Sequence, residues 1–404
     1  MKKCNPVVIG SGEFFPPQVF DNKTLIRSFD LRYPEGMPGK GGELLGSDMP
    51  ERLWGIKARR LNLVADAAGL LYKKPLGKGG WYDCNMGAEA AKQAICQAAQ
   101  REGMTEVELT DKIRVVIEAS ATLPIGVGDH QGHYIKELGL NNPDFDSKMV
   151  GCGGMLTALN SARRALSAGE DYVLVVFSNC PSQHFATLKD RQGYGGEMGN
   201  KACALMFSDG ATAFVLGRTE KDQGFIEWTH NVDLGTEYTL IEVPNNVYYM
   251  HVDNVGNTFV PTMMKNYESA RTIFKDRFGV DDPAEKIARL VSHQASLPGV
   301  IETVWRTGLI CKIDRDLSVR LSTYYTLDKR ERRQQMSFIL EAAEKIRRVV
   351  PTMMQSFGNP AVASSATILH RALNDGVGPD STLLGMVIGA GRGGTEYGVF
   401  VYQT

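Results

Sequence analysis

The chain has 404 residues, with 45 lysines and arginines against 46 aspartates and glutamates, which gives a formal net charge of −1 at pH 7. A dedicated nucleic-acid-binding protein usually carries a strongly basic face, so this balance argues against that class. The hydrophobic content of 43% and the charged content of 23% are ordinary for a soluble globular protein that can bury a large core.

The start of the chain lacks the pattern of a secretion signal. Its apolar stretch, Val7 to Ile9, is far shorter than the roughly 7–15 residues that a signal peptide needs. No later stretch reaches the roughly 18 apolar residues of a membrane helix. Seven cysteines without a CxxC spacing indicate neither a disulfide framework nor a zinc site. We therefore expect a cytoplasmic protein with reduced thiols.

Segments rich in valine, isoleucine and leucine alternate with helical stretches, which predicts an α/β fold. In the first half, a strand is expected over 114–121. Further along, Cys152 stands between Gly151 and Gly153 at the predicted junction of a strand and a helix. Apolar side chains recur along this helix, which is expected to end at Gly169.

The second half repeats this pattern. A strand over 289–296 matches the one over 114–121, and the helix after Asn359 ends at Gly376, at the same spacing as Cys152 to Gly169. Similar βα units also arise by chance, but two matched places favour a duplication. We therefore expect one layered αβαβα domain with two pseudo-twofold halves, 1–218 and 219–404. The second half is longer by about 32 residues, which predicts a surface insertion within 297–356.

The glycines around Cys152 allow a sharp turn and leave its sulfur uncrowded. Free N–H groups at a helix N-terminus favour a thiolate and can also stabilise an oxyanion on a bound acyl carbonyl. These features predict a nucleophile. The alternative is a buried structural cysteine, which is the commoner role for cysteines in general.

Several motifs in the correct order resemble the thiolase superfamily, specifically its β-ketoacyl-acyl carrier protein synthase III branch. The resemblance covers most of the chain. Its motifs are Trp54-Gly-Ile-Lys-Ala-Arg, Phe207-Ser-Asp-Gly-Ala, Ser292-His-Gln-Ala-Ser, Phe357-Gly-Asn-Pro-Ala and Gly389-Ala-Gly-Arg-Gly-Gly.

This resemblance implies a thiolase-like duplicated fold and a catalytic set of Cys152, His293 and Asn359. Neutral imidazole and amide N–H groups can stabilise an enolate oxygen without a charge. It further implies an oxyanion hole from the backbone of Cys152, Ala390 and Gly391. Taken singly, a histidine at a strand end is more often a core residue, and an asparagine after glycine more often a turn residue.

The resemblance also implies partners. The expected substrates are acyl-CoA or acyl carrier protein thioesters, both carrying phosphopantetheine, with no bound cofactor or metal. Lys201 stands where the family usually has an arginine and is expected to bind the carrier phosphate. A homodimer without nucleic acid or membrane partners is expected.

The sequence departs from the family where coenzyme A is usually held. Where the family usually has a tryptophan and an arginine, this stretch reads Met49-Pro-Glu-Arg-Leu-Trp, and Pro298 stands at the place of a later arginine. A carrier-protein donor or a shifted pantetheine tunnel therefore stays as open as acyl-CoA. Another departure from the family pattern is Ser208, which stands where the family has a glycine.

The insertion holds the charge-rich run Asp314 to Arg333, followed by a predicted helix around Glu341. Its basic residues suggest a lid or a docking surface for an acidic carrier protein. The alternative is an ordinary solvated charged face.

Two histidines, His130 and His133, have a spacing that could bind a metal on a helix, but no third ligand is evident and a polar face is expected.

The resemblance predicts a decarboxylating condensation in fatty acid or secondary metabolism. Two alternatives stay open: transfer of the acyl group to an alcohol or amine, which family members associate with Asp in place of Asn359, and a non-catalytic subunit of a heterodimeric synthase. Head-to-head condensation of two acyl chains would call for a carboxylate base that the sequence does not reveal.

Overall fold

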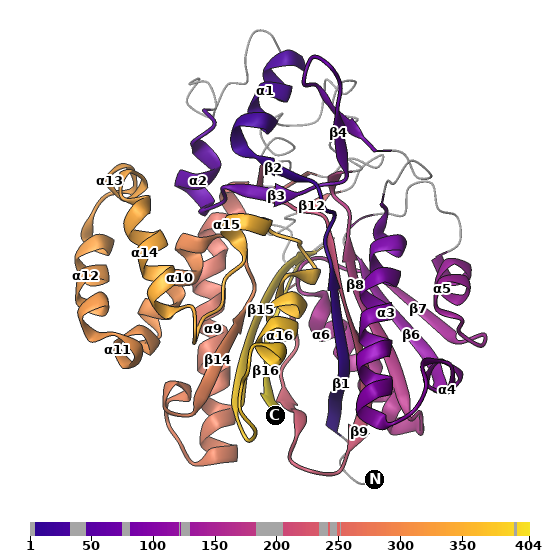
Figure 1. The fold of residues 1–404 in the computed structure, drawn as a ribbon. Coiled ribbons are helices and arrows are strands. Elements are labelled where there is room, and N and C mark those ends of the chain that lie inside the picture. The colour runs from indigo at the N-terminus through magenta and orange to yellow at the C-terminus, as the bar shows by residue number, and fades with distance from the viewer. Residues whose placement is uncertain are drawn as a thin grey trace.

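The computed structural model describes residues 5–32, 46–74, 81–120, 122, 130–182, 205–233, 241–242, 249–250, 252–391 and 394–404. Its strands and helices alternate as the sequence predicts, and they form two main sheets with helices between and outside them (Figure 1).

The first sheet comes from the first half of the chain. Its strand order is β1-β9-β8-β6-β7, with β6 parallel to both β7 and β8. The strands are β1 (Asn5–Phe14), β6 (Ile113–Ser120), β7 (Asp144–Met149), β8 (Tyr172–Asn179) and β9 (Gly210–Thr219).

The second sheet comes from the second half. Its order is β10-β16-β15-β14, with β11 also paired to β16, and β14 and β15 are parallel. The strands are β10 (Gly224–Trp228), β11 (Asn231–Asp233), β14 (Ile287–Ser292), β15 (Thr382–Gly391) and β16 (Gly394–Gln403).

Two helices lie between the sheets. Helix α6 (Gly154–Ala168) contacts β6 and β8 on one side and β15 and β16 on the other, and α16 (Ala363–Asn374) contacts β8, β9 and β14. Helix α3 (Asp83–Glu102) covers the outer face of the first sheet, and α9 (Val252–Phe278) covers that of the second (Figure 1). The predicted αβαβα layering is thus confirmed.

Close packing of α3 explains the Gly10-x-Gly12 pattern near the start of the chain. A Cβ atom added to Gly10 would lie 2.1 Å from the carbonyl oxygen of Ala94, and one added to Gly12 would lie 2.3 Å from that of Ala90. The two glycines therefore allow the alanine-rich face of α3 to lie directly on β1. Their role here is packing.

The helices of the segment in which the insertion is predicted form a lobe beside the second sheet, at the left of Figure 1. It packs through α10 and α14 onto the core under α9. The helices are α10 (Leu297–Arg306), α11 (Leu309–Ile313), α12 (Arg315–Thr326), α13 (Lys329–Gln334), α14 (Met336–Ile346) and α15 (Met354–Phe357).

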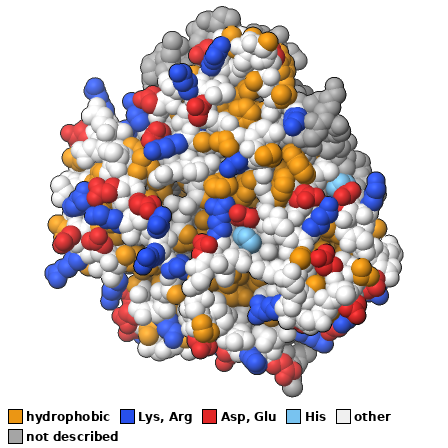
Figure 2. Space-filling view, in the orientation of Figure 1, with side chains coloured by type: hydrophobic (Ala, Val, Ile, Leu, Met, Phe, Trp, Pro, Cys, Tyr) orange, Lys and Arg blue, Asp and Glu red, His pale blue; other side chains and the backbone are white. Residues whose placement is uncertain are grey.

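Acidic and basic side chains intermix over the outside of this lobe (Figure 2). Several of them form ion pairs, including Arg320 with Glu341 at 2.9 Å and Arg347 with Glu344 at 2.9 Å. Exposed pairs of this kind add little stability. The outer face of the lobe therefore fits the solvated alternative stated above.

Smaller elements complete the described part of the chain. They are α1 (Asn22–Arg32), α2 (Met49–Trp54), α4 (Glu106–Lys112), α5 (His130–Leu138), the 3-10 turn Pro283–Glu285, and the strands β2 (Val19–Asp21), β3 (Ala58–Arg60), β4 (Leu63–Ala65), β5 (Leu71–Lys73), β12 (Ile241–Glu242) and β13 (Tyr249–Met250). None of the helices in the described ranges has both the length and the apolar content to cross a membrane.

Candidate active site

Cys152 lies between the end of β7 and the start of α6, at the strand–helix junction that the sequence predicts. Its side chain is buried, with 4% of its surface exposed, and it belongs to the core between the two sheets. Gly153 is the residue before the first turn of α6. The thiol therefore stands at the N-terminus of a buried helix, where free N–H groups can face a bound oxygen.

Strand β15 of the second half passes directly against this turn. A Cβ atom added to Gly389 would lie 1.6 Å from the backbone nitrogen of Gly153 and 2.5 Å from the carbonyl carbon of Cys152. Only glycine fits at such a close approach. Ala390 and Gly391 are the next two residues of β15, so the backbone predicted to form the oxyanion hole follows immediately after this contact.

His293 follows β14 directly, and its backbone N–H donates to the carbonyl oxygen of Met386 on β15 at 3.1 Å. Its side chain is 3% exposed, and its Nδ1 atom has no hydrogen-bond partner among the described residues. Because a buried polar atom of this kind is unusual, it needs an explanation such as a group supplied by substrate. Burial lowers the pKa of His293 from 6.5 to about 3.

Asn359 lies between α15 and α16 and is 1% exposed. Its side-chain Oδ1 accepts a hydrogen bond from the N–H of Ala361 at 2.9 Å, and its backbone N–H donates to the carbonyl oxygen of Met206 at 3.1 Å. With Oδ1 engaged, the Nδ2 hydrogens are the groups that this amide can offer to a substrate.

The start of α16 differs from the prediction. The sequence pattern puts Asn359 at the helix N-terminus as the counterpart of Cys152, but α16 begins only at Ala363. Ala361 has a positive φ of 49°, so the chain turns once more before the helix starts. Ser208 adds to this turn, because its N–H donates to the carbonyl oxygen of Asn359 at 2.9 Å.

Contacts between the three segments bring the candidate residues into one region. The N–H of Gln294, next to His293, donates to Oγ of Ser364 in the first turn of α16 at 3.0 Å. A Cβ atom added to Gly154, in the first turn of α6, would lie 3.0 Å from Cγ2 of Val362 at the start of α16. The two central helices and the end of β14 thus meet where Cys152, His293 and Asn359 lie.

The low pKa of His293 predicts a pH-dependent stability. Between about pH 6.5 and pH 3 the unfolded chain binds a proton that the folded chain does not, so stability falls as the pH falls through this window. Relative to a His293→Gln variant, the wild-type free energy of unfolding should decrease by up to about 1.4 kcal/mol per pH unit below pH 6.5. Urea unfolding at pH 7, 6 and 5 measures this difference, and equal slopes for both proteins would contradict the buried neutral imidazole.

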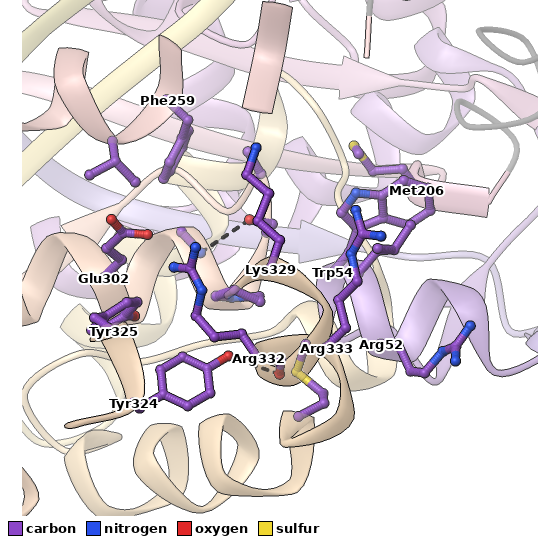
Figure 3. Close-up of a pocket in the computed structure, with 17 residues that line it drawn as sticks. Arg52, Trp54, Met206, Phe259, Glu302, Tyr324, Tyr325, Lys329, Arg332 and Arg333 are labelled. Carbon is purple, nitrogen blue, oxygen red and sulfur yellow. Dashed lines mark hydrogen bonds between the residues drawn. The ribbon is translucent and has the colours of Figure 1, made fainter. Parts of the chain in front are cut away.

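A cavity of about 360 Å³ leads from the surface toward these residues. Phe259 lines it, with its ring centroid 6.5 Å from that of His293, and so does Met206, whose carbonyl oxygen accepts the backbone hydrogen bond of Asn359. The cavity runs between α2, α10 and the insertion helices (Figure 3). Its other lining residues include Trp54, Ala295, Ser296, Pro298, Gly299, Tyr324, Tyr325 and Met336.

The mouth of this cavity is cationic. Lys329, Arg332 and Arg333 of α13 line it (Figure 3), and so does Arg52 of α2, which forms an ion pair with Asp48 at 3.0 Å. Within the described ranges, no ion pair with a carboxylate is recorded for the three α13 side chains, although Arg332 lies 5.8 Å from the ring of Tyr325. Unpaired cations beside aromatic rings suit an anionic ligand such as a phosphate.

Among the described residues that line the cavity, the one carboxylate is paired with an arginine. Glu302 lies 2.8 Å from Arg306 on the same helix. The net charge at the mouth is therefore positive, in contrast to the mixed charge on the outer face of the lobe.

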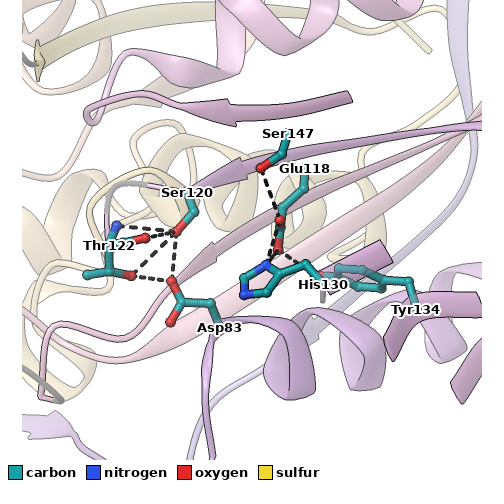
Figure 4. A network of polar contacts seen from close by, with 7 residues as sticks. All are labelled: Asp83, Glu118, Ser120, Thr122, His130, Tyr134 and Ser147. Atoms are coloured by element: carbon teal, nitrogen blue, oxygen red, sulfur yellow. Dashed lines mark hydrogen bonds and ion pairs between the residues drawn. The ribbon is translucent and has the colours of Figure 1, made fainter. Parts of the chain in front are cut away.

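A buried polar network lies on the other side of the first sheet (Figure 4). His130 at the start of α5 bonds through Nδ1 to Glu118 of β6 at 2.8 Å, and Tyr134 donates to the same carboxylate at 3.0 Å. Beside them, Ser120 donates to Asp83 at 2.7 Å, and burial raises the pKa of Asp83 to about 6. The network fixes the end of β6 against α3 and α5.

The histidine pair of α5 therefore has structural partners. His133 bonds to Asn85 at 3.2 Å rather than sharing a ligand with His130. In the described part of the chain, no group of three metal-ligating side chains lies together.

Lys201, the predicted phosphate-binding residue, lies outside the described residues. The α13 cations were anticipated only as a possible docking surface. Phe259 was not predicted, since it stands in no recognisable motif, and only the packing of α9 beside the cavity reveals it.

Comparison with known proteins shows what the chain resembles. Residues 145–233, which include Cys152, match the sequence-family model of 3-oxoacyl-[acyl-carrier-protein] synthase III. A β-ketoacyl-[acyl-carrier-protein] synthase III of Phocaeicola vulgatus is 22% identical over 282 residues, which is 68% of either chain.

Solved structures share the fold over the whole chain. The 3-oxoacyl-(acyl carrier protein) synthase III of Pseudomonas aeruginosa is 18% identical with a TM-score of 0.67, covering 99% of this chain and 98% of that one. OleA of Xanthomonas campestris, solved with lauric acid and lauroyl-CoA, is 17% identical with a TM-score of 0.70 and full coverage of both chains.

Proposed function

We propose that this chain is a thiolase-superfamily enzyme of the β-ketoacyl synthase III-like type, which joins an acyl group held on Cys152 to a malonyl thioester with loss of CO2. The observation that carries the proposal is the cavity that leads from a cationic mouth to Phe259 and Met206, the neighbours of His293 and Asn359.

In the first step the thiolate of Cys152 attacks the carbonyl carbon of the donor thioester. The carbonyl oxygen becomes an oxyanion, which the N–H groups at the start of α6 and in the 389–391 strand are placed to stabilise. The donor thiol then leaves with a proton, and the acyl group stays on sulfur.

In the second step a malonyl thioester occupies the cavity. Loss of CO2 leaves its electron pair on an enolate, whose oxygen accepts hydrogen bonds from an N–H of His293 and from Nδ2 of Asn359. The enolate carbon attacks the acyl carbonyl and expels the Cys152 thiolate, giving a β-ketoacyl thioester. A neutral imidazole suits this role, and the low pKa of His293 keeps it neutral at ordinary pH.

The cationic mouth supports a donor that carries phosphate. Phosphopantetheine is common to acyl-CoA and acyl carrier protein, and its phosphate would reach Lys329, Arg332 and Arg333 while the pantetheine arm follows the cavity inward. These cations come from the insertion, so they would replace the basic residues that the family usually has before Trp54.

Replacing both α13 arginines tests this donor route. Arg332→Ala combined with Arg333→Ala should raise the KM for acyl-CoA or acyl carrier protein about tenfold or more, since each lost charge-assisted bond to phosphate costs on the order of 1.5–3 kcal/mol. Arg330→Ala is the matched control, because this exposed arginine of the same helix does not line the cavity. If the double variant has the same KM as the control, the donor phosphate does not bind to the α13 arginines.

Product analysis tests the reaction itself. After incubation with acyl and malonyl thioesters, a β-ketoacyl thioester with release of CO2 is the expected result. An ester or amide formed from an added alcohol or amine, without CO2, would assign the chain to simple acyl transfer. Absence of any acylated protein over a panel of acyl-CoA and acyl-carrier donors would favour a non-catalytic subunit.

We also propose a homodimer. In the described part of the first sheet, β7 is the end strand and pairs with β6 along one edge, so its other edge is available to the same strand of a second copy. Light scattering should then give twice the 44.4 kDa mass of the chain, and a monomer mass would reject this pairing.

A further inference from the structure

Glu396 of β16 packs against the residue that follows the proposed nucleophile. A Cβ atom added to Gly153 would lie 2.6 Å from Cβ of Glu396. In the β15–β16 hairpin Glu396 is paired with Gly389, which contacts the same turn. Glu396 therefore belongs to the second-half surface on which the Cys152 turn rests.

The carboxylate of Glu396 is held beside the first turns of α6. Its Oε2 accepts a hydrogen bond from Oγ1 of Thr157 at 3.0 Å and lies 3.6 Å from Nε2 of His230. Thr157 is five residues after Cys152, and side chains of a helix lean toward its N-terminus. Together with the contact of Glu396 at Gly153, this hydrogen bond places the carboxylate beside the turn that carries Cys152.

Two further side chains, Trp228 and Asn160, fix the tautomer of His230. Nε1 of Trp228 donates to Oδ1 of Asn160 at 2.9 Å, and since a tryptophan only donates, this contact assigns the amide orientation. Nδ2 of Asn160 then donates to Nδ1 of His230 at 3.0 Å. The ring proton of neutral His230 is therefore on Nε2, the atom that faces Glu396.

Among the described residues, one titratable side chain, His230, and the arginine Arg163 bear on the surroundings of Glu396. From the segment between β10 and β11 it faces His230, and from α6 the nearest basic side chain is Arg163, which lies over the Trp228 ring at 4.1 Å from its centroid. Glu396 is 19% exposed, so its charge is only partly screened by water.

We propose that Glu396 is a positioning residue that fixes the first turn of α6, and with it Cys152, against the β15–β16 hairpin. The inference rests on the proposed function, because it takes Cys152 as the nucleophile. In this proposal, the contacts of Glu396 with Gly153 and Thr157 hold the Cys152 thiol and the 389–391 backbone in a fixed relative position. A nucleophile shifted by about 1 Å can lose about a hundredfold in rate, so such a link affects chemistry.

The test compares Glu396→Ala with Glu396→Gln. The alanine variant should acylate Cys152 about tenfold or more slowly with little change in KM, whereas the glutamine variant can still accept from Thr157 and should recover most of the rate. Removing a nearby negative charge favours the thiolate, so in both variants the pH midpoint of Cys152 alkylation by iodoacetamide should move to lower pH. Glu227→Gln, a β10 carboxylate bonded to Arg277 at 3.2 Å, is the control.

Thr157→Val removes the same hydrogen bond from the helix side and keeps the shape of the side chain. Thr157→Val should slow acylation as Glu396→Ala does. It replaces Glu396→Ala as the test variant if the alanine variant fails to fold. Wild-type acylation rates in Glu396→Ala and Thr157→Val, together with wild-type alkylation midpoints in the two Glu396 variants, would overturn the proposal. Alkylation by iodoacetamide needs no thioester, so this readout decides the role of Glu396 even if Cys152 accepts no acyl group.

Discussion

Replacing Asn359 or His293 by alanine should lower the rate of malonyl decarboxylation by about 10²–10³-fold each, while Cys152 still becomes acylated. Each substitution removes one N–H donor from the place where the enolate charge would develop, and the loss of one preorganised donor has an effect of this size. Both side chains are almost fully buried, at 1% and 3% exposure, so water cannot readily replace the missing donor.

The measurement is CO2 release from the malonyl thioester by enzyme that has first been loaded with an acyl group. His370→Ala is the control, because His370 is a half-buried histidine of α16 that bonds to Ser11 and does not line the cavity. Decarboxylation at the wild-type rate in either site variant would remove that residue from the proposed mechanism.

Replacing Cys152 by alanine should abolish the acyl-enzyme altogether. Intact-mass measurement should show the added mass of one acyl group on the wild type and none on the Cys152→Ala variant. Cys311→Ala is the control: Cys311 is exposed, whereas Cys152 is 4% exposed, so accessibility alone would favour labelling of Cys311. An acyl adduct that survives in Cys152→Ala and disappears in Cys311→Ala would reject the assigned nucleophile.

The fold and the positions of the three candidate residues could be predicted because they rest on local patterns. Glycines around Cys152 mark the strand–helix turn, and the periodic helix after it ends at Gly169, as the structure has it. His293 follows its strand directly, as the position of its motif at the end of an apolar run predicts. Local backbone preferences are sufficient for such statements.

The remaining features depend on contacts between distant segments. Contact of Glu396 with Gly153 requires the register of β15 with β16, and the sequence does not state which residues pair. The basic residues of α13 could be read as a solvated face or a docking surface. Only the packing of α13 beside α2 turns Arg332 and Arg333 toward the cavity.

The start of α16 was predicted too early for a similar reason. Matching Asn359 to Cys152 assumes that both halves enter their helices in the same way, but Asn359 also pairs with Phe207 and bonds to Met206 before the helix begins. These tertiary contacts override the local helical pattern. The division into halves at residue 218 remains a proposal, supported by the origin of the two sheets in residues 5–219 and 224–403.

A single turnover provides the most direct test of the central claim that Cys152, His293 and Asn359 form one condensing site. Isolated acyl-enzyme is mixed with malonyl thioester labelled in its free carboxyl carbon, and labelled CO2 is counted against the acyl groups lost from Cys152. We expect one CO2 for each acyl group, with the label absent from a β-ketoacyl product. Loss of the acyl group without labelled CO2 would contradict the account.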